Sequence, residues 1–149
     1  MKSPAAGATG IRTLAIPALQ NRTTSFQVEQ RLTRALIEEF SRRSPYKITS
    51  QESGADAVLR GDVIGVGALP VIIGNESVGN TFLVTLVTNV KLVDLKTNKT
   101  LFRKDAFVFH EEYVINFNVK QFFSEQNPAV DRMAQDFARS VAATVLAGN

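Results

Sequence analysis

The chain has 149 residues, of which 44% are hydrophobic and 21% charged, and these proportions suit one compact domain with one core. The net charge of +3 is a mild excess that favours anionic partners only weakly. The absence of cysteine excludes disulfides, zinc-thiolate sites and a cysteine nucleophile. The longest uncharged apolar run, residues 63–73, is far shorter than the ~20 residues that span a bilayer.

The chain begins with small residues and glycines that lack the apolar stretch of a signal peptide. Either the protein is cytoplasmic or its export signal has been removed. In the second case, which we adopt, residues 1–10 are expected to be a flexible segment that follows the removed signal or lipid anchor. Residues 11–149 are expected to form a single α/β domain. Alternating residues from Ile11 to Ile16 predict a short strand that Pro17 ends, and Leu19–Thr23 is predicted to be a loop.

The next segment has the features of a helix. Thr24 and Gln27 have the spacing of a capping box. Apolar residues then recur at helical spacing as far as Phe40. We therefore predict a helix from about Gln27 to Arg43, ended by Ser44 and Pro45.

Two more strands are predicted at Tyr46–Thr49 and Ala55–Ile64, with a turn at Gln51–Gly54 between them. Gly61 lies inside the second strand, which indicates either a bulge or a close approach of another part of the chain. Residues Ala68–Asn80 carry a proline and two glycines, so we expect a loop.

This predicted loop contains three consecutive apolar residues, Val71, Ile72 and Ile73. One interpretation is a strand extension or a buried turn. The other is a segment that inserts into a partner, because exposed contiguous apolar surface usually marks an interface. We take these three residues as a candidate partner interface.

Two long strands and a helix complete the chain. Alternation predicts strands at Thr81–Leu95 and Leu101–Ile115, joined by a hairpin turn at Lys96–Lys99. A final helix is expected to begin with Pro128 after an Asn127 cap. Its predicted buried stripe comprises Val130, Met133, Phe137, Val141 and Val145. The order β-α-β-β-β-β-α predicts an α+β fold, a two-layer sandwich with both helices on one face of a mainly antiparallel sheet.

Catalytic chemistry is poorly supported. The one histidine, His110, lies in a predicted strand, and no second histidine or cysteine is present to complete a transition-metal site. The adjacent pairs Glu38–Glu39 and Glu111–Glu112 do not face each other in a helix or a strand. We expect a non-enzymatic protein without catalytic residues, cofactor or metal. Nucleic acid is poorly supported as a binding partner, because the sequence contains no RNA-recognition or zinc-finger pattern.

Several segments of the sequence resemble those of a known family. The sequence resembles the lipopolysaccharide-assembly lipoprotein family over nearly the whole length from Ile11 to Leu146. The segments that carry it are Leu14–Pro17, Asn21–Thr23, Val28–Leu36, Ala55–Gly61 and the closing helix.

The resemblance implies a small domain tethered by an N-terminal lipid to the periplasmic face of the outer membrane. Such a protein plugs and helps to fold a large outer-membrane β-barrel that exports lipopolysaccharide, and lipopolysaccharide itself is a candidate direct ligand. The family's lipid-bearing cysteine is absent from this chain, so membrane attachment is an inference. The alternative is a periplasmic lipoprotein adaptor that activates a peptidoglycan synthase or a secretion channel. A hydrolase of unknown type is a third, weaker hypothesis.

The candidate lipopolysaccharide-binding residues are Lys91 and Lys120. The resemblance implies basic contacts near the loop before the last helix, where Lys120 lies. Lys91 and Arg103 are expected to point to one face of their strands and Lys104 to the other. Because both helices cover one sheet face, we expect Lys91 to reach a phosphate on the open face.

Overall fold

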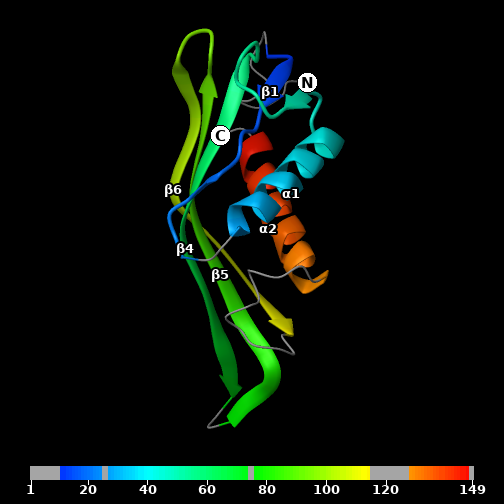
Figure 1. Ribbon diagram of the computed structural model, residues 1–149, viewed down its shortest axis with the longest axis vertical. Coiled ribbons are helices and arrows are strands. Elements are labelled where there is room, and N and C mark those ends of the chain that lie inside the picture. Colours follow the sequence, from blue (N-terminus) through cyan, green and yellow to red (C-terminus); the bar gives the residue numbers. More distant parts are fainter. Residues whose placement is uncertain (1–10, 25–26, 74–75, 115–127, 148–149) are drawn as a thin grey trace.

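The computed structural model describes residues 11–24, 27–73, 76–114 and 128–147. Two helices lie on one face of a six-stranded sheet (Figure 1), which confirms the predicted α+β two-layer sandwich. The elements in chain order are β1 (Thr13–Ala15), β2 (Gln20–Asn21), α1 (Val28–Arg43), β3 (Lys47–Thr49), β4 (Ala57–Ile73), β5 (Glu76–Asp94), β6 (Lys99–Val114) and α2 (Pro128–Leu146).

The sheet is mixed, with the strand order β3-β1-β4-β5-β6. The strands β4, β5 and β6 form a long antiparallel meander. The short strands β1, β2 and β3 make parallel pairs, and both β1 and β2 pair with β4. The prediction of a loop over residues 19–23 was therefore wrong for β2, because a strand of two residues is too short to show an alternating pattern.

Strand β4 continues to Ile73, so the prediction of a loop over residues 68–80 was also wrong. Pro70 stands in register with Phe82 of β5. Proline is tolerated in an edge strand because its missing N–H group is not needed on the unpaired side. Beyond Val63, β4 pairs only with β5 among the described residues. Residues 71–73 therefore extend a strand, which was one of the two interpretations of this segment.

The N-terminal cap of α1 differs from the predicted one. Gln27 is itself the N-cap residue, with φ at 62°, and its side chain makes no capping hydrogen bond. The predicted capping box with Thr24 is therefore wrong. The predicted end is correct, since Ser44 follows the last helical residue and donates its backbone N–H to Phe40. For α2, the Asn127 cap lies outside the described residues.

The core lies between the helices and the inner face of the sheet. All five residues of the predicted α2 stripe are buried. Phe137 packs edge to face against Phe107 and Phe109 of β6, with ring centroids 6.4 and 6.0 Å apart. Such aromatic pairs add roughly 0.5–1.5 kcal/mol each to the burial itself. The even-numbered residues of β5 from Val84 to Leu92 complete this surface.

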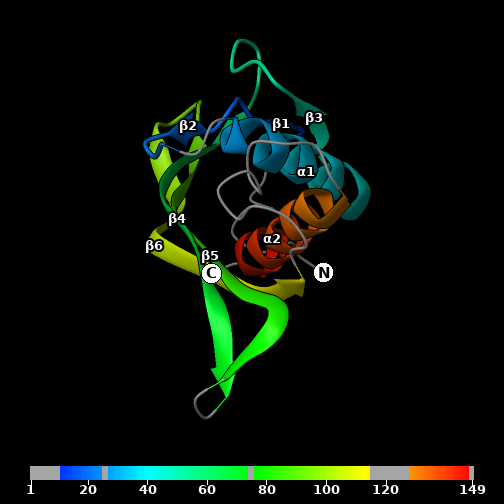
Figure 2. The same ribbon diagram turned by 60° about the horizontal axis from the view of Figure 1, so that its bottom comes forward.

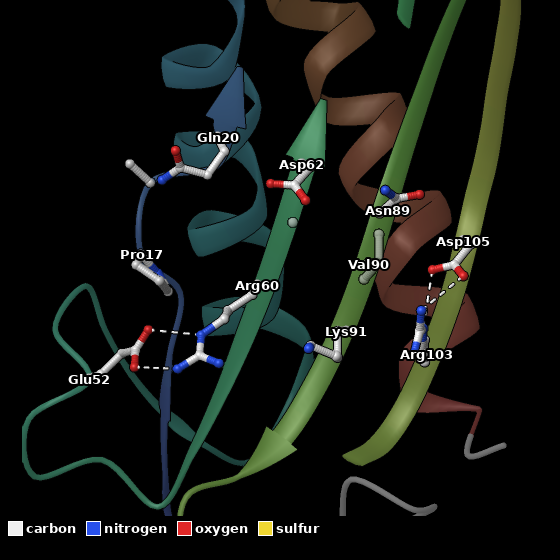
Figure 3. Close-up of a pocket in the computed structure, with 12 residues that line it drawn as sticks. Pro17, Gln20, Glu52, Arg60, Asp62, Asn89, Val90, Lys91, Arg103 and Asp105 are labelled. Atoms are coloured by element: carbon white, nitrogen blue, oxygen red, sulfur yellow. Dashed lines mark hydrogen bonds and ion pairs between the residues drawn. The ribbon is translucent and has the colours of Figure 1, made fainter. Parts of the chain in front are cut away.

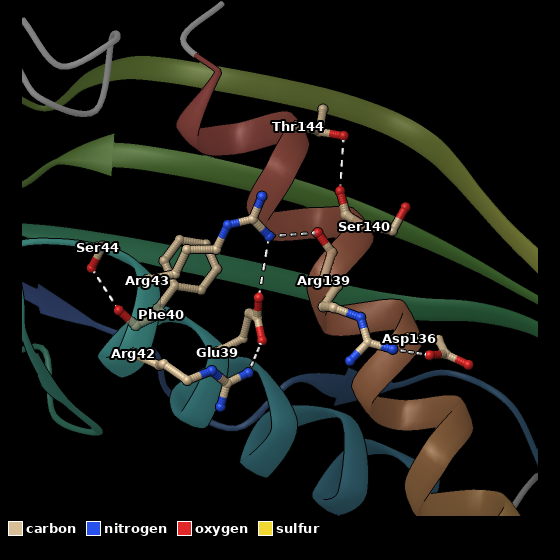
Figure 4. Close-up of polar contacts among 9 residues, drawn as sticks. All are labelled: Glu39, Phe40, Arg42, Arg43, Ser44, Asp136, Arg139, Ser140 and Thr144. Atoms are coloured by element: carbon tan, nitrogen blue, oxygen red, sulfur yellow. Dashed lines mark hydrogen bonds and ion pairs between the residues drawn. The ribbon is translucent and has the colours of Figure 1, made fainter.

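A polar contact joins the two helices where they lie side by side (Figure 4). Glu39 of α1 is buried, and its carboxylate accepts hydrogen bonds from Arg42 and Arg43. Arg43 also donates to the backbone carbonyl of Arg139 on α2, at 3.3 Å. A buried carboxylate needs such partners. Glu39 therefore orients Arg43 for its contact with α2.

Strands β4 and β5 extend far beyond the helices as a two-stranded arm (Figures 1 and 2). We define the arm as residues 69–73 of β4 with 76–83 of β5. Residues 81–83, at its base, also pair with β6, so the arm has two strands beyond Thr81. Leu69 and Ile72 are 68% and 58% exposed. Two strands without a covering layer are only marginally stable by themselves. The arm therefore presents apolar side chains that the fold of this chain leaves uncovered.

Candidate functional site

Three basic side chains stand in one row across the central strands. Arg60 of β4 is in register with Lys91 of β5, which is in turn in register with Arg103 of β6. Residues directly opposite each other in neighbouring strands project from the same sheet face. The row lies on the open face, since the adjacent residues Leu59, Val90 and Leu92 are buried on the helix side.

A bulge in β6 brings Arg103 into this row. Four residues of β6, from Lys104 to Phe107, span the same length as three residues of β5, from Thr88 to Val90, and Ala106 has φ at 53°. The extra residue lets Arg103 face outwards while Phe107 faces the core. The side chain of Asn89 secures the bulge, because its Oδ1 accepts the Ala106 N–H at 2.9 Å.

Each arginine of the row is held by a carboxylate. Arg60 donates from Nε and Nη2 to both oxygens of Glu52, at 3.1 and 2.7 Å. Arg103 donates in the same way to both oxygens of Asp105, at 3.2 Å each. The hydrogen bonds between Arg60 and Glu52 lower the pKa of the carboxyl and raise the pKa of the guanidinium. Both guanidinium groups are thereby held in a fixed orientation.

Lys91 differs from its two neighbours. Within the described part of the chain its ammonium group makes no ion pair or hydrogen bond, and it points from β5 towards β4 (Figure 3). Like charges directly opposite each other in a sheet are destabilising. The two arginines each have a carboxylate partner. Of the three cations in the row, Lys91 is therefore the one that can pair with an anionic ligand without losing an ion pair to a described residue.

The row lines a depression of about 430 Å³ on the open sheet face (Figure 3). Pro17 and Ala18, from the segment between β1 and β2, form one wall together with Gln20 of β2. Asp62 and Asn89 stand in the next row of side chains. Asp62 pairs with Arg22, at 3.6 Å. The depression therefore combines three cations with three carboxylates, those of Glu52, Asp62 and Asp105, and adds amide groups and a small apolar wall.

The structure does not bring the predicted site residues together. Lys91 lines the depression, whereas Val71 and Ile72 lie at the far end of β4. Twelve residues of extended strand between Arg60 and Ile72 correspond to roughly 40 Å. Ile72 is exposed and Val71 is half-buried, while the side chain of Ile73 lies outside the described positions. Lys120 also lies outside the described residues.

Sequence reasoning found Lys91 and the outward direction of Arg103 but missed Arg60, Asn89 and both carboxylate partners. The expectation for Lys104 is confirmed, since it stands opposite the buried Val90. Arg60 belongs to a strand far from Lys91 in the sequence, and only the β4–β5 register places them side by side. A signal was present, because Arg60 and Asp62 are polar residues at alternate positions of an otherwise apolar strand.

Comparisons with known proteins agree with this architecture. The fold is that of an α+β domain seen in several bacterial lipoproteins. The family model for lipopolysaccharide assembly, LptE, matches residues 11–145, so the chain belongs to the LptE family. A search among proteins with curated descriptions found no match.

Solved structures support the fold alone, since their sequences are distant. The hypothetical protein CT253 from Chlamydia trachomatis is 9% identical, with a TM-score of 0.59 over 91% of this chain and 96% of that chain. Lipoprotein GNA1162 from Neisseria meningitidis is 13% identical, with a TM-score of 0.54 over 90% and 97%. The PelC dodecamer from Paraburkholderia phytofirmans is 13% identical, with a TM-score of 0.53 over 98% and 94%.

Neither of the two helices in the described part of the chain is long and apolar enough to cross a membrane. No group of three or more His, Cys, Asp or Glu side chains in the same residues is arranged to hold a metal ion.

Proposed function

We propose that this protein is a non-enzymatic lipoprotein of the outer membrane that plugs the lipopolysaccharide-exporting β-barrel and assists its assembly. Membership of the lipopolysaccharide-assembly family supports the process. The observation that supports the proposed plugging of a barrel is the β4–β5 arm. It extends past the helices, and Leu69 and Ile72 on it are exposed. Exposed apolar side chains on an element without its own core fit a surface that a partner covers.

The proposed partner interface comprises Val71, Ile72 and Ile73, with Leu69 added from the exposure of its side chain. The lumen of a large outer-membrane barrel is polar, so a plug needs a mostly polar surface with limited apolar contacts. The apolar residues of the arm would contact the barrel wall, while the charged open face of the sheet would meet polar groups.

Co-expression with the large outer-membrane barrel of the same genome, followed by pull-down, tests this function. The wild-type chain should recover the barrel, and the double variant Leu69→Thr with Ile72→Thr should recover much less. The matched control is Ile64→Thr with Val108→Thr, since these residues are 41% and 51% exposed but lie outside the arm. Equal recovery by both double variants, or capture of a peptidoglycan synthase or secretion channel in place of the barrel, would contradict the proposal.

Direct contact with lipopolysaccharide is the second part of the proposed function. We assign it to Lys91 and Lys120, because lysine pairs with phosphate and carboxylate groups. The double reversal Lys91→Glu with Lys120→Glu should weaken binding in surface plasmon resonance, and added salt should act in the same direction. Binding that responds to neither change would exclude these two residues as the contact.

A further inference from the structure

The open face of the sheet carries an apolar row that both helices leave uncovered (Figure 1). The row comprises Ile64 of β4, Val87 of β5 and Val108 of β6. We propose that this face is the interface of a symmetric dimer of the chain, in which the two sheets pack face to face. The proposal goes beyond the proposed function, because it concerns the free chain before its open face meets the barrel or lipopolysaccharide.

The sheet register places the three residues of the row side by side. Val87 is in register with Val108, and the bulge in β4 makes Ile64 and Gly65 together oppose Val87. Val87 projects from the open face, since the residues on either side of it in β5 are buried against the helices. Ile64 and Val108 are 41% and 51% exposed. Contiguous apolar side chains of this kind fit a surface that a partner covers.

A free charge lies on each side of the apolar row. Lys91 is four residues from Val87 along β5, and Glu112 is four residues from Val108 along β6. Because the two strands are antiparallel, the charged residues lie in opposite directions from the row, each about 13 Å away. Neither charged group makes an ion pair or a hydrogen bond within the described part of the chain.

A two-fold axis along the apolar row brings these free charges together. Rotation about this axis places each residue of the row over its own copy and reverses the strand direction of the second sheet. The end of the face that carries Lys91 then lies over the end that carries Glu112 in the other protomer, so the dimer contains two identical pairs of opposite charge. Packed sheets lie about 10 Å apart, which a lysine and a glutamate extended towards each other can span.

This self-complementarity is the argument for a second copy as the partner. The arginines that lie near Lys91 on this face each pair with a carboxylate of their own chain. A partner therefore has to supply a carboxylate opposite Lys91 and a cation opposite Glu112, with an apolar row between them. A second copy of the chain supplies all three at the required spacing.

Sedimentation equilibrium of the purified full chain over a range of concentrations tests the dimer. The wild-type chain should show a reversible monomer–dimer equilibrium. The double variant Ile64→Thr with Val108→Thr should raise the dissociation constant at least about tenfold, because it changes the centre of the interface in both protomers. The same variant is expected to recover the barrel normally, so the dimer and the plug function are tested separately.

Reversal of the two free charges tests the arrangement within the dimer. Lys91→Glu and Glu112→Lys should each weaken the dimer about tenfold, because each variant places like charges together at two positions. The double variant should restore the dissociation constant to within about threefold of wild type, since the pairs are again of opposite charge. Glu111→Lys is the matched control and should have no effect. Glu111 is exposed, but it is in register with the buried Val84 and so projects from the helix side.

The absence of cysteine from the chain allows a direct test of the axis. Val108→Cys should be cross-linked to its own copy by a short bis-maleimide, because Val108 lies on the two-fold axis. Glu111→Cys provides the control, since its thiol projects from the other face of the same strand and should be cross-linked far less.

Three results would overturn the proposal. A wild-type chain that stays monomeric at every concentration excludes the dimer. A double charge variant that dimerises no better than the single variants excludes the pairing of Lys91 with Glu112. Cross-linking of Glu111→Cys as efficient as that of Val108→Cys would place the contact on another face of the protein.

Discussion

The hydroxyl group of Tyr113 on β6 donates a hydrogen bond of 2.7 Å to the Oδ2 atom of Asp136 on α2. The Oδ1 atom of the same carboxylate accepts from Arg139 on the helix. Tyr113 is buried, so its hydroxyl needs this partner, and the bond connects the edge strand of the sheet to the second helix. Burial raises the pKa of Tyr113 far above its ordinary value, and the bond to Asp136 raises it further.

The first prediction follows from this bond. The variant Tyr113→Phe should lower the free energy of unfolding at neutral pH by about 1–2 kcal/mol, because it removes a hydrogen bond to a charged group. A tyrosine whose pKa is raised in the folded state stabilises fully below its unfolded pKa of about 10, and this stabilisation is lost as pH rises above that value. The difference between wild type and variant should therefore shrink above about pH 10.

Urea denaturation of both proteins at neutral and alkaline pH measures this difference. Tyr46 is common to both proteins, so its own titration cancels in the comparison. A difference that stays constant, or grows, at alkaline pH would show that the Tyr113 hydroxyl does not titrate in the way described.

The second prediction concerns Asp56, which lies before β4. Its Oδ2 atom accepts the backbone N–H groups of Arg12 and Thr13, at 2.8 and 3.0 Å, and Oδ1 pairs with Lys96 at 3.1 Å. These contacts, with the Arg12 bond first, lower the pKa of Asp56 to about 2. A lowered pKa stabilises the fold above the unfolded value of about 4, and the effect is lost as pH falls towards 2.

Asp56→Asn should therefore be less stable than wild type at neutral pH, and the two proteins should converge between about pH 4 and pH 2. Urea midpoints across this range provide the measurement. Lys96→Gln serves as the control, since it removes the ion pair but keeps both backbone hydrogen bonds, and it should retain most of the pH dependence. A wild-type advantage that persists unchanged at about pH 2 would refute this role of Asp56.

The third prediction compares two glycines of β4. A Cβ atom on Gly61 would lie 2.7 Å from the Cδ2 atom of the buried Leu19 and 3.3 Å from the Asn89 carbonyl oxygen. A Cβ atom on Gly67 would meet nothing within 4 Å. Gly61→Ala should destabilise the domain by about 1–3 kcal/mol through overpacking. Gly67→Ala should be neutral or stabilising by about 0.5 kcal/mol, because it restricts the unfolded chain.

Thermal unfolding followed by circular dichroism distinguishes the two variants. Similar melting temperatures for Gly61→Ala and Gly67→Ala would mean that Leu19 moves aside at no cost. The comparison also tests the sequence interpretation of Gly61. The close contact is present, while the irregularities in the β4–β5 pairing lie between Val63 and Gly65 and between Pro70 and Ile72, not at Gly61 itself.

The long strands and the α2 stripe could be predicted because their apolar residues repeat with a regular period over many positions. The extension of β4 was missed because Pro70 was taken as a local break, whereas its effect depends on which edge of the strand is paired. The basic row was predicted only in part. The short turn at residues 96–99 fixes the register between β5 and β6, so the pairing of Lys91 with Arg103 could be predicted. Arg60 lies in a strand far from Lys91 in the sequence, and no feature near either residue predicts that the two pair.

The arm also affects where the sheet unfolds locally. Backbone hydrogen bonds near the core are shielded by the helices on one face, whereas the far end of β4 and β5 extends beyond both helices (Figure 2). Ile72 is in register with Ser77 at this end of the ladder. Local opening costs least where few apolar contacts must break. Amide hydrogens should therefore exchange fastest along the distal part of the β4–β5 ladder and slow progressively towards Leu86. The sheet thus has a gradient of local stability along its length, and its least stable end is the one that presents Leu69 and Ile72.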